Sequence, residues 1–398
     1  MPNDTPLSAI YPPDYESLWI DTPAALQDAL QRLEKTDWLA VDTEFIRGTT
    51  FYPAPALLQL YDRQCVYLVD MLKITDWSGV SRLFENRDIL KVVHACSEDL
   101  ELFNCVGLSQ PYGMIDTQVA NALLDGELNE GLQSLVRQNL GIELEKQATR
   151  SDWTQRPLTD KQIQYAQEDV VVLWPLYQKL EEGLRQSGKY EIALEEGEAM
   201  RLAAAGVQDV GRYYLKLRGG WRLRKGAQQL LAKLAAWREQ EARGRDIPRK
   251  KICPDDELIA IAQRRPRTLG QLTEITSIQG AGLRRYGTEL VGMVREHMQS
   301  EGDEPEAGFE MIRPPIPREY QDLVKKVKKL TQKLAREHRI NVGLLASRGL
   351  LEEFVYWHIQ GGVGTQPQLL QGWRGRICAA PLERWLQNDN SVPPQQSS

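Results

Sequence analysis

Hydrophobic positions follow two different patterns along the chain, and the pattern changes near residue 200. In the first half, short apolar runs bounded by turn residues are typical of strands, and stretches with helical periodicity lie between them. The predicted strands are Ser17–Ile20, Trp38–Asp42, Ala56–Leu60, Val66–Val69 and Leu90–Val93. The early strands are close enough for hairpins and the later ones are separated by helices, which predicts an α/β fold with a mixed sheet.

Six helices are predicted in this half. The first has Thr22 as its N-cap and Pro23 as its first residue, and it ends near Lys35. The others are Ser78–Glu85, a helix that begins near Ser97, Thr117–Leu124, Leu132–Asn139, and one long helix from Thr159 to about Arg185. After residue 200 the strand signals disappear. Residues 223–300 and 318–388 both have helical patterns and similar lengths, which indicates a degenerate internal duplication.

The net charge of −6 conceals an asymmetry between the two halves. Residues 1–200 hold 33 acidic and 16 basic residues, a net charge of −17, whereas residues 201–398 hold 22 and 33, a net charge of +11. One interpretation is an acidic half that holds metal ions and a basic half that binds an anionic partner. The other is two solvated surfaces, and charge alone does not separate them.

Composition also narrows the class of protein. No run approaches the ~18 apolar residues of a transmembrane helix, and the first residues do not resemble a secretory signal, so no membrane association is expected. The five cysteines are scattered without a CxxC pair, and the four histidines form no HxxxH or HExxH zinc motif. A reducing, cytoplasmic location is therefore expected.

Two acidic residues close one of the predicted strands, in the sequence VDTEF. Because side chains alternate along a strand, Asp42 and Glu44 share one face. Neighbouring carboxylates repel each other unless cations lie between them, and hard divalent cations prefer oxygen ligands. The alternative is a pair of solvent-facing acids, and the pattern alone does not decide.

Two further acidic motifs follow. The sequence HACSED, residues 94–99, runs from a strand end into a helix, where Asp99 either carries chemistry or favours the helix dipole. Tyr165 and Asp169 are four residues apart and share a helix face. A buried carboxylate there needs a cation or a hydrogen-bond donor, so the alternative is an ordinary Tyr–Asp hydrogen bond.

In this order, the three motifs resemble the DEDD superfamily of 3′→5′ exonucleases, in the subgroup whose last motif carries a tyrosine. The surrounding residues resemble the bacterial ribonuclease D family. The stretches that carry the resemblance are VDTEFIRGTTFYPAPALLQLYD, ITDWSGV, HACSEDLELF, MIDTQVANALL, SDWTQRPLTDKQIQYAQEDVVVLWPL and GGWRLRKGAQQLLAKLAAWRE. The helical second half resembles the paired HRDC domains of that family. The resemblance implies a ribonuclease H-like exonuclease domain followed by two all-α HRDC-type domains.

With this resemblance, the chain divides into six predicted segments. They are a flexible N-terminal segment (1–16), the exonuclease domain (17–200), a first HRDC-like domain (220–300), an acidic, Pro-rich linker (301–316), a second HRDC-like domain (317–388) and a disordered tail (389–398).

The resemblance implies hydrolysis of RNA from its 3′ end with two divalent metal ions, Mg²⁺ or Mn²⁺, releasing nucleoside 5′-monophosphates. The metal ligands that it implies are Asp42, Glu44, Asp99 and Asp169. Tyr165 is expected to orient the attacking water, because a tyrosine with a pKa near ~10 is a poor base at neutral pH.

Several other residues are candidates for RNA contacts. His94 lies beside one acidic motif, and Arg156 suits a phosphate group. A basic stripe on one predicted helix consists of Lys325, Lys329, Lys333 and Arg336. It either binds the RNA backbone or is a solvated face, and the resemblance favours RNA. We expect residues 1–200 to carry the chemistry, so that truncation after about residue 215 keeps cleavage of short oligonucleotides.

The expected substrates are structured RNAs such as tRNA precursors, and no obligate protein partner is evident. Two other functions stay open at this point. One is a 3′→5′ DNA proofreading or repair exonuclease, because no motif shows recognition of the 2′-hydroxyl. The other is a non-catalytic RNA-binding protein, which the loss of a motif carboxylate would support.

Overall fold

The computed structural model describes residues 15–144, 151–206, 209–300 and 308–388, and the chain divides into two compact units. Unit 1 comprises residues 1–46, 55–205 and 316–398, and unit 2 comprises residues 47–54 and 206–315. The predicted tail and nearly all of the predicted N-terminal segment lie outside the described residues, as do residues 301–307 of the predicted linker.

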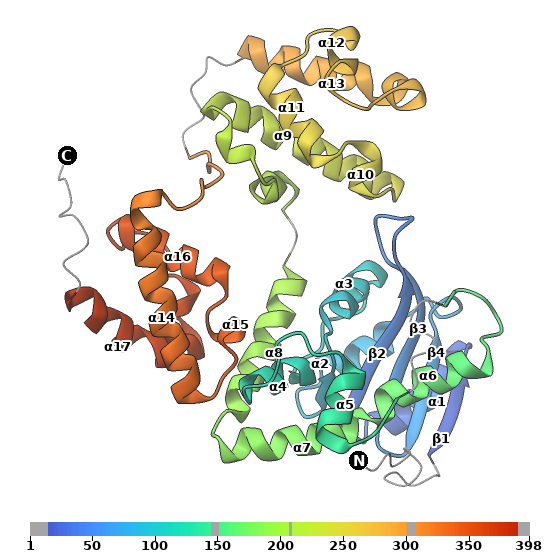
Figure 1. Cartoon of the computed structure of the whole chain (residues 1–398). Coiled ribbons are helices and arrows are strands. Elements are labelled where there is room, and N and C mark those ends of the chain that lie inside the picture. Colours follow the sequence, from blue (N-terminus) through green and yellow to red (C-terminus); the bar gives the residue numbers. More distant parts are fainter. Residues whose placement is uncertain (1–14, 145–150, 207–208, 301–307, 389–398) are drawn as a thin grey trace. The chain divides into compact units, whose positions relative to one another are not determined.

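Unit 1 contains a six-stranded mixed sheet (Figure 1). Its strands are β1 (Glu16–Ile20), β2 (Trp38–Ile46), β3 (Ala54–Tyr61), β4 (Cys65–Asp70), β5 (Leu90–Val93) and β6 (Met114–Asp116). Their order is β1-β4-β3-β2-β5-β6, with β1 parallel to β4, β3 antiparallel to β4, and β5 parallel to both β2 and β6. The sequence analysis missed β6, because three residues are too short a run for its periodicity to be read.

Helices pack on both faces of this sheet. They are α1 (Pro23–Leu33), α2 (Ser78–Glu85), α3 (Ser97–Val106), α4 (Thr117–Leu123), α5 (Leu132–Leu140), α6 (Asp160–Val171), α7 (Leu173–Gln186) and α8 (Tyr190–Ala205). On β2, Leu39 and Val41 pack in one core with α1, α2 and α3. Trp38 and Ala40 pack in the other core, with α4 to α7. This alternation fixes which face receives the acidic residues that follow on β2.

Local sequence explains where the helices begin and end. The Thr22 hydroxyl accepts a hydrogen bond from the Ala25 N–H at 3.3 Å, as expected of an N-cap. The predicted single helix from Thr159 to Arg185 is wrong: α6 ends at Val171 and α7 begins at Leu173. Pro175 has no N–H to donate to the carbonyl of Val171, so the hydrogen-bond ladder of α6 cannot continue there.

The described part of unit 2 is helical around its own core. Its elements are the 3₁₀ helices η2 (Val210–Lys216) and η3 (Gly220–Arg222) and the helices α9 (Lys225–Arg245), α10 (Arg249–Ile252), α11 (Asp255–Arg264), α12 (Leu269–Thr273) and α13 (Gly280–Ser300). The fully buried Glu239 accepts from the Arg249 guanidinium at 2.8 Å, and the fully buried Arg238 pairs with Asp255 at 2.8 Å. Some of the basic residues of this half are therefore used inside the fold.

The C-terminal helices belong to unit 1, together with the sheet. They are η4 (Arg318–Tyr320), α14 (Gln321–His338), α15 (Val342–Leu345), α16 (Arg348–Ile359), η5 (Gln368–Leu370) and α17 (Gly372–Asn388). Their apolar residues continue the core that covers one face of the sheet. The described helices of the whole chain include none with the length and apolarity needed to cross a membrane.

Polar contacts also join these C-terminal helices to the sheet domain. The buried Lys189 ammonium donates to the carbonyls of Leu123 at 2.7 Å and Arg339 at 2.8 Å. Glu196 accepts from the Trp373 indole at 2.5 Å and from Arg374 at 2.6 Å. Truncation after residue 215 would leave Lys189 and Glu196 without these partners and expose apolar core. The structure therefore argues against the expectation that such a truncated chain keeps its activity.

Candidate active site

Strand β2 presents Asp42 and Glu44 on the sheet face that α6 covers. The residues between and before them, Thr43 and Val41, are buried on the opposite face. The alternation predicted from the sequence is thus present. Both carboxylates are half-buried near the C-terminal end of β2, the strand next to β5.

Helix α6 brings the third acidic residue to the same place. Thr159 and Gln162 form a capping box that fixes the start of the helix. Asp169, only 9% exposed, accepts a hydrogen bond from the Tyr165 hydroxyl one turn earlier. Carboxylate oxygens of Asp42, Glu44 and Asp169 lie within 4.8 Å of one another. A strand and a helix separated by more than a hundred residues therefore build one carboxylate cluster.

Asp99, in the first turn of α3, lies beside this cluster without belonging to the close group of three. Its carboxylate accepts a hydrogen bond from the Thr43 hydroxyl. Burial, followed by the charge of Asp42, raises the pKa of Asp99 well above its ordinary value. The Asp99 charge in turn contributes to the raised pKa of Glu44. All four predicted acidic residues therefore share one electrostatic environment.

The cluster concentrates negative charge where ionisation is unfavourable. Burial, followed by the Asp169 charge, raises the pKa of Asp42 to about 8. Burial, followed by neighbouring carboxylates, raises the pKa of Glu44 to about 10. Burial likewise raises the pKa of Asp169 to about 7, against the lowering effect of the Tyr165 hydrogen bond. Converging carboxylate oxygens of this kind are the ligands that hard divalent cations prefer, so the donor set fits such ions.

Comparison with known proteins agrees with the exonuclease fold predicted from the sequence motifs. Residues 18–185 match the family model of a 3′-5′ exonuclease, residues 227–294 that of the HRDC domain, and residues 318–382 that of the ribonuclease D C-terminal HRDC domain. The chain is 35% identical to the ribonuclease D of Cronobacter turicensis over 353 residues, which are 88% of this chain and 94% of that protein. The chain belongs to the ribonuclease D family.

The Escherichia coli member supports this assignment in sequence and in structure. The chain is 32% identical to the ribonuclease D of strain K12 over 370 residues, 92% of this chain and 98% of that protein. The crystal structure of the E. coli enzyme, described as an exoribonuclease involved in structured RNA processing, matches with a TM-score of 0.87 over 96% of this chain and 100% of that one. The predicted fold class and the predicted 3′→5′ exoribonuclease activity are confirmed, and the exonuclease family is metal-dependent.

Two of the residues predicted to contact RNA, His94 and Arg156, make polar contacts with other residues of the protein. His94 Nδ1 lies 2.9 Å from the Thr117 hydroxyl, and burial lowers the pKa of His94. Arg156 donates to both carboxylate oxygens of the buried Asp70, at 2.8 and 2.7 Å, and to the carbonyl of Ala56 at 2.8 Å. A contact of Arg156 with RNA would have to compete with this ion pair.

The basic stripe lies on α14, as the sequence predicted. Its four residues are exposed, opposite the buried apolar positions of the same helix. Two of them form exposed ion pairs, Lys325 with Asp322 at 2.8 Å and Lys333 with Glu337 at 3.6 Å. Exposed pairs of this kind contribute little stability. The stripe belongs to the same unit as the carboxylate cluster.

Sequence reasoning overlooked two residues at the site. Thr43, between the two acids of β2, bonds Asp99 and so links two of the motifs. Asp116, at the end of β6, is an acidic residue only 3% exposed that accepts backbone hydrogen bonds. An aspartate directly after two apolar residues was a signal that this strand was present.

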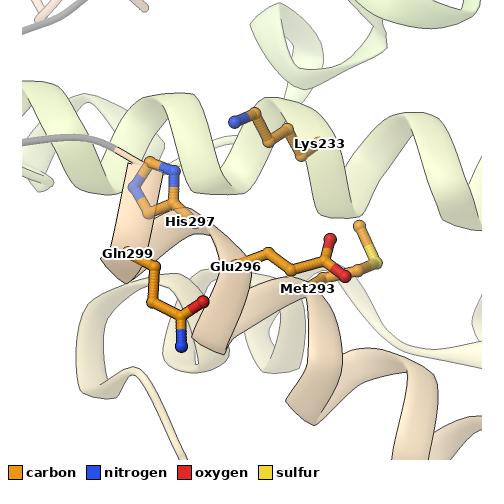
Figure 2. A pocket seen from close by; sticks show the side chains of 5 residues that line it. All are labelled: Lys233, Met293, Glu296, His297 and Gln299. Carbon is orange, nitrogen blue, oxygen red and sulfur yellow. The ribbon is translucent and has the colours of Figure 1, made fainter.

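A cavity of about 580 Å³ lies in unit 2 between α9 and α13 (Figure 2). Lys233 of α9 lines it, together with Met293, Glu296, His297 and Gln299 of α13. None of the predicted site residues is among them, and the carboxylate cluster belongs to unit 1. The cavity is therefore not part of the cluster.

Proposed function

We propose that Asp42, Glu44, Asp99 and Asp169 hold two divalent metal ions, Mg²⁺ or Mn²⁺, and that the enzyme shortens RNA from its 3′ end by releasing nucleoside 5′-monophosphates. The observation that carries this proposal is the approach of three carboxylates to within 4.8 Å in a partly buried site. Such a cluster is unfavourable without cations and favourable with them.

When bound, divalent ions supply an activated water and stabilise the charge of the leaving 3′-oxygen. The residues of the chain do the rest. Asp42 would contribute to both ion sites, because the Asp169 charge helps to raise the pKa of Asp42 and the Asp42 charge helps to raise the pKa of Asp99. Thr43 holds the Asp99 carboxylate by its hydrogen bond.

Tyr165 acts by orientation rather than by taking up a proton. Burial, followed by the Asp169 charge, raises the pKa of Tyr165 above its ordinary value, so its hydroxyl keeps the proton at neutral pH. It therefore donates a hydrogen bond, to Asp169 in this structure. Together with Glu44, Tyr165 would orient the water that attacks the terminal phosphodiester bond.

The proposed substrates are structured RNAs with a free 3′ end, and tRNA precursors in particular. The exposed stripe of α14 supplies positive charge for the backbone of such RNAs. None of the five cysteines, all of which lie in the described residues, forms a disulfide bond, which supports the proposed cytoplasmic location.

The test is digestion of one tRNA precursor carrying either a 5′ label or a 3′ label, with Mg²⁺, Mn²⁺ or EDTA. We expect the 5′-labelled RNA to shorten stepwise and the 3′-labelled RNA to release labelled mononucleotide first, only with metal. Asp42→Asn is the matched inactive control, and single-stranded DNA is the substrate control. Equal cleavage in EDTA would contradict the metal site, and faster cleavage of DNA would favour a DNA exonuclease.

A further inference from the structure

The position of Asp99 depends on the short turn between β5 and α3. The chain leaves β5 at Val93, and α3 begins at Ser97, so residues 94–96 set the direction of the helix. Ala95 in this turn has a φ of 53°. This left-handed conformation is unfavourable for alanine, so the turn needs contacts that hold it. Asp99 follows four residues later, in the first turn of α3.

Asp116 supplies those contacts. It lies opposite Val93 in the parallel pairing of β5 and β6 and is 3% exposed. One carboxylate oxygen accepts from the Ala95 N–H at 3.1 Å, and the other accepts from the Cys96 N–H at 3.0 Å. The first oxygen also accepts from the Gln118 N–H at 2.8 Å, which caps α4. One buried carboxylate thus binds both N–H groups of the turn and the start of a neighbouring helix.

The next residue reinforces the same turn. The Thr117 hydroxyl lies 3.1 Å from the Val93 carbonyl and 2.9 Å from His94 Nδ1. The Asp-Thr pair at the end of β6 therefore contacts each of the residues 93–96. These contacts help to hold the turn between β5 and α3.

The opposite side of Asp99 is fixed as well. Its carboxylate accepts from Thr43, the residue between the two acids of β2. The side chain of Asp99 is therefore held by β2, and the turn before its helix is held from the end of β6. A change at either anchor would move its carboxylate relative to Asp42 and Glu44, which are fixed by β2 itself. Metal ligation is sensitive to such displacements, because ligand residues act only within a narrow geometry.

We propose that Asp116 is a positioning residue of the exonuclease site: by binding the N–H groups of Ala95 and Cys96, it holds Asp99 where it can share a metal ion with Asp42. This inference rests on the proposed function of the four carboxylates. Asp116 touches neither substrate nor metal in this role. It acts through the backbone of the turn, so its loss alters metal binding before it alters RNA binding.

Two substitutions separate geometry from charge. Asp116→Asn keeps one oxygen acceptor and replaces the other with an amide group that cannot accept from the turn. Asp116→Glu keeps the negative charge but displaces both oxygens by one methylene. The control is Asp62→Asn, in another turn of the same sheet. One Asp62 oxygen accepts from the N–H groups of Gln64 at 2.9 Å and Cys65 at 2.8 Å, and the other accepts from the Tyr67 hydroxyl at 3.0 Å, a bond that an amide nitrogen cannot accept. Asp62 is not among the predicted site residues.

The full-length variants are compared by calorimetric titration with Mn²⁺, by thermal unfolding in EDTA, and by single-turnover cleavage at increasing Mn²⁺. We expect both Asp116 variants to weaken Mn²⁺ binding by roughly 10-fold or more, with the rate partly restored at saturating Mn²⁺ and the RNA Kd unchanged. Asp62→Asn should lower the unfolding temperature without shifting the Mn²⁺ midpoint. If Asp116→Glu fails to fold, Asp116→Asn alone decides.

The proposal is overturned if Asp116→Asn lowers only the unfolding temperature, as the control does. It is also overturned if Asp116→Glu binds Mn²⁺ like the wild type, because charge rather than geometry would then explain the effect. Asp99→Asn, measured in parallel, separates this failure from that of the proposed function. If Asp99→Asn itself retains normal Mn²⁺ binding and turnover, the site assignment is wrong. If Asp99→Asn loses both while Asp116→Asn is normal, only the positioning role fails.

Discussion

Replacing Asp42 with asparagine should stabilise the metal-free protein while it removes activity. The carboxylate oxygens of Asp42 and Asp169 lie within 4.8 Å of each other, and burial is the main cause that raises the pKa of Asp42 to about 8. At an effective dielectric constant of about 20, two charges at this distance repel each other by roughly 3 kcal/mol. Asparagine removes that repulsion and one source of desolvation, so we expect a gain of about 1–3 kcal/mol at alkaline pH.

The gain should depend on pH in a defined direction. The pKa values of Asp42 and Glu44, about 8 and about 10, are higher in the folded protein than in the unfolded chain. The folded apoprotein therefore binds more protons than the unfolded chain between about pH 4 and these values, and its stability falls as the pH rises through them. We expect the wild-type apoprotein to lose stability between pH 6 and pH 9, and Asp42→Asn to lose less.

Urea unfolding in EDTA at the two pH values measures the difference, and Mn²⁺ should stabilise the wild type more than the variant. Asp88→Asn is the control, because Asp88 is an exposed acid of the same unit. The reasoning is refuted if Asp42→Asn is less stable than the wild type in EDTA at pH 9, or if the difference between them is the same at both pH values.

Three further predictions follow from the same structure. Tyr165→Phe should change the Mn²⁺ affinity by no more than about threefold and lower the single-turnover rate by roughly 10²-fold, because it removes an orienting hydroxyl and no charge. A large loss of Mn²⁺ affinity at an unchanged rate would contradict this role. The double variant Lys329→Glu, Lys333→Glu should bind a tRNA precursor more weakly and with a smaller salt dependence, without a change in the cleavage rate of a bound short oligonucleotide. If the variant and the wild type have equal salt slopes, the stripe is only a solvated face. Glu196→Ala removes the acceptor of the Trp373 indole and one of the acceptors of Arg374, so it should lower the free energy of unfolding of the nuclease by about 1–3 kcal/mol. Independent unfolding of the C-terminal helices, with the nuclease unaffected, would show that these contacts contribute nothing.

Local patterns were sufficient wherever one element determined the outcome. The alternation on β2 predicted the shared face of Asp42 and Glu44, and helical spacing predicted the shared face of Tyr165 and Asp169. Capping residues predicted the starts of α1 and α6. These features depend on backbone geometry over a few residues, which the sequence specifies directly. Resemblance to a known family then supplied the function that spacing alone left open.

Other features were decided only when distant elements packed together. Arg156 was read as a phosphate contact because its type allows one, yet in the fold it pairs with Asp70, 86 positions earlier in the sequence. Asp116 became an anchor for the turn before α3 because β6 lies beside β5. The C-terminal helices became part of the nuclease unit because their apolar faces continue its core. Periodicity shows which face of an element is apolar, but which surface covers that face depends on the register and packing of elements far apart in the chain, and only the tertiary structure determines these.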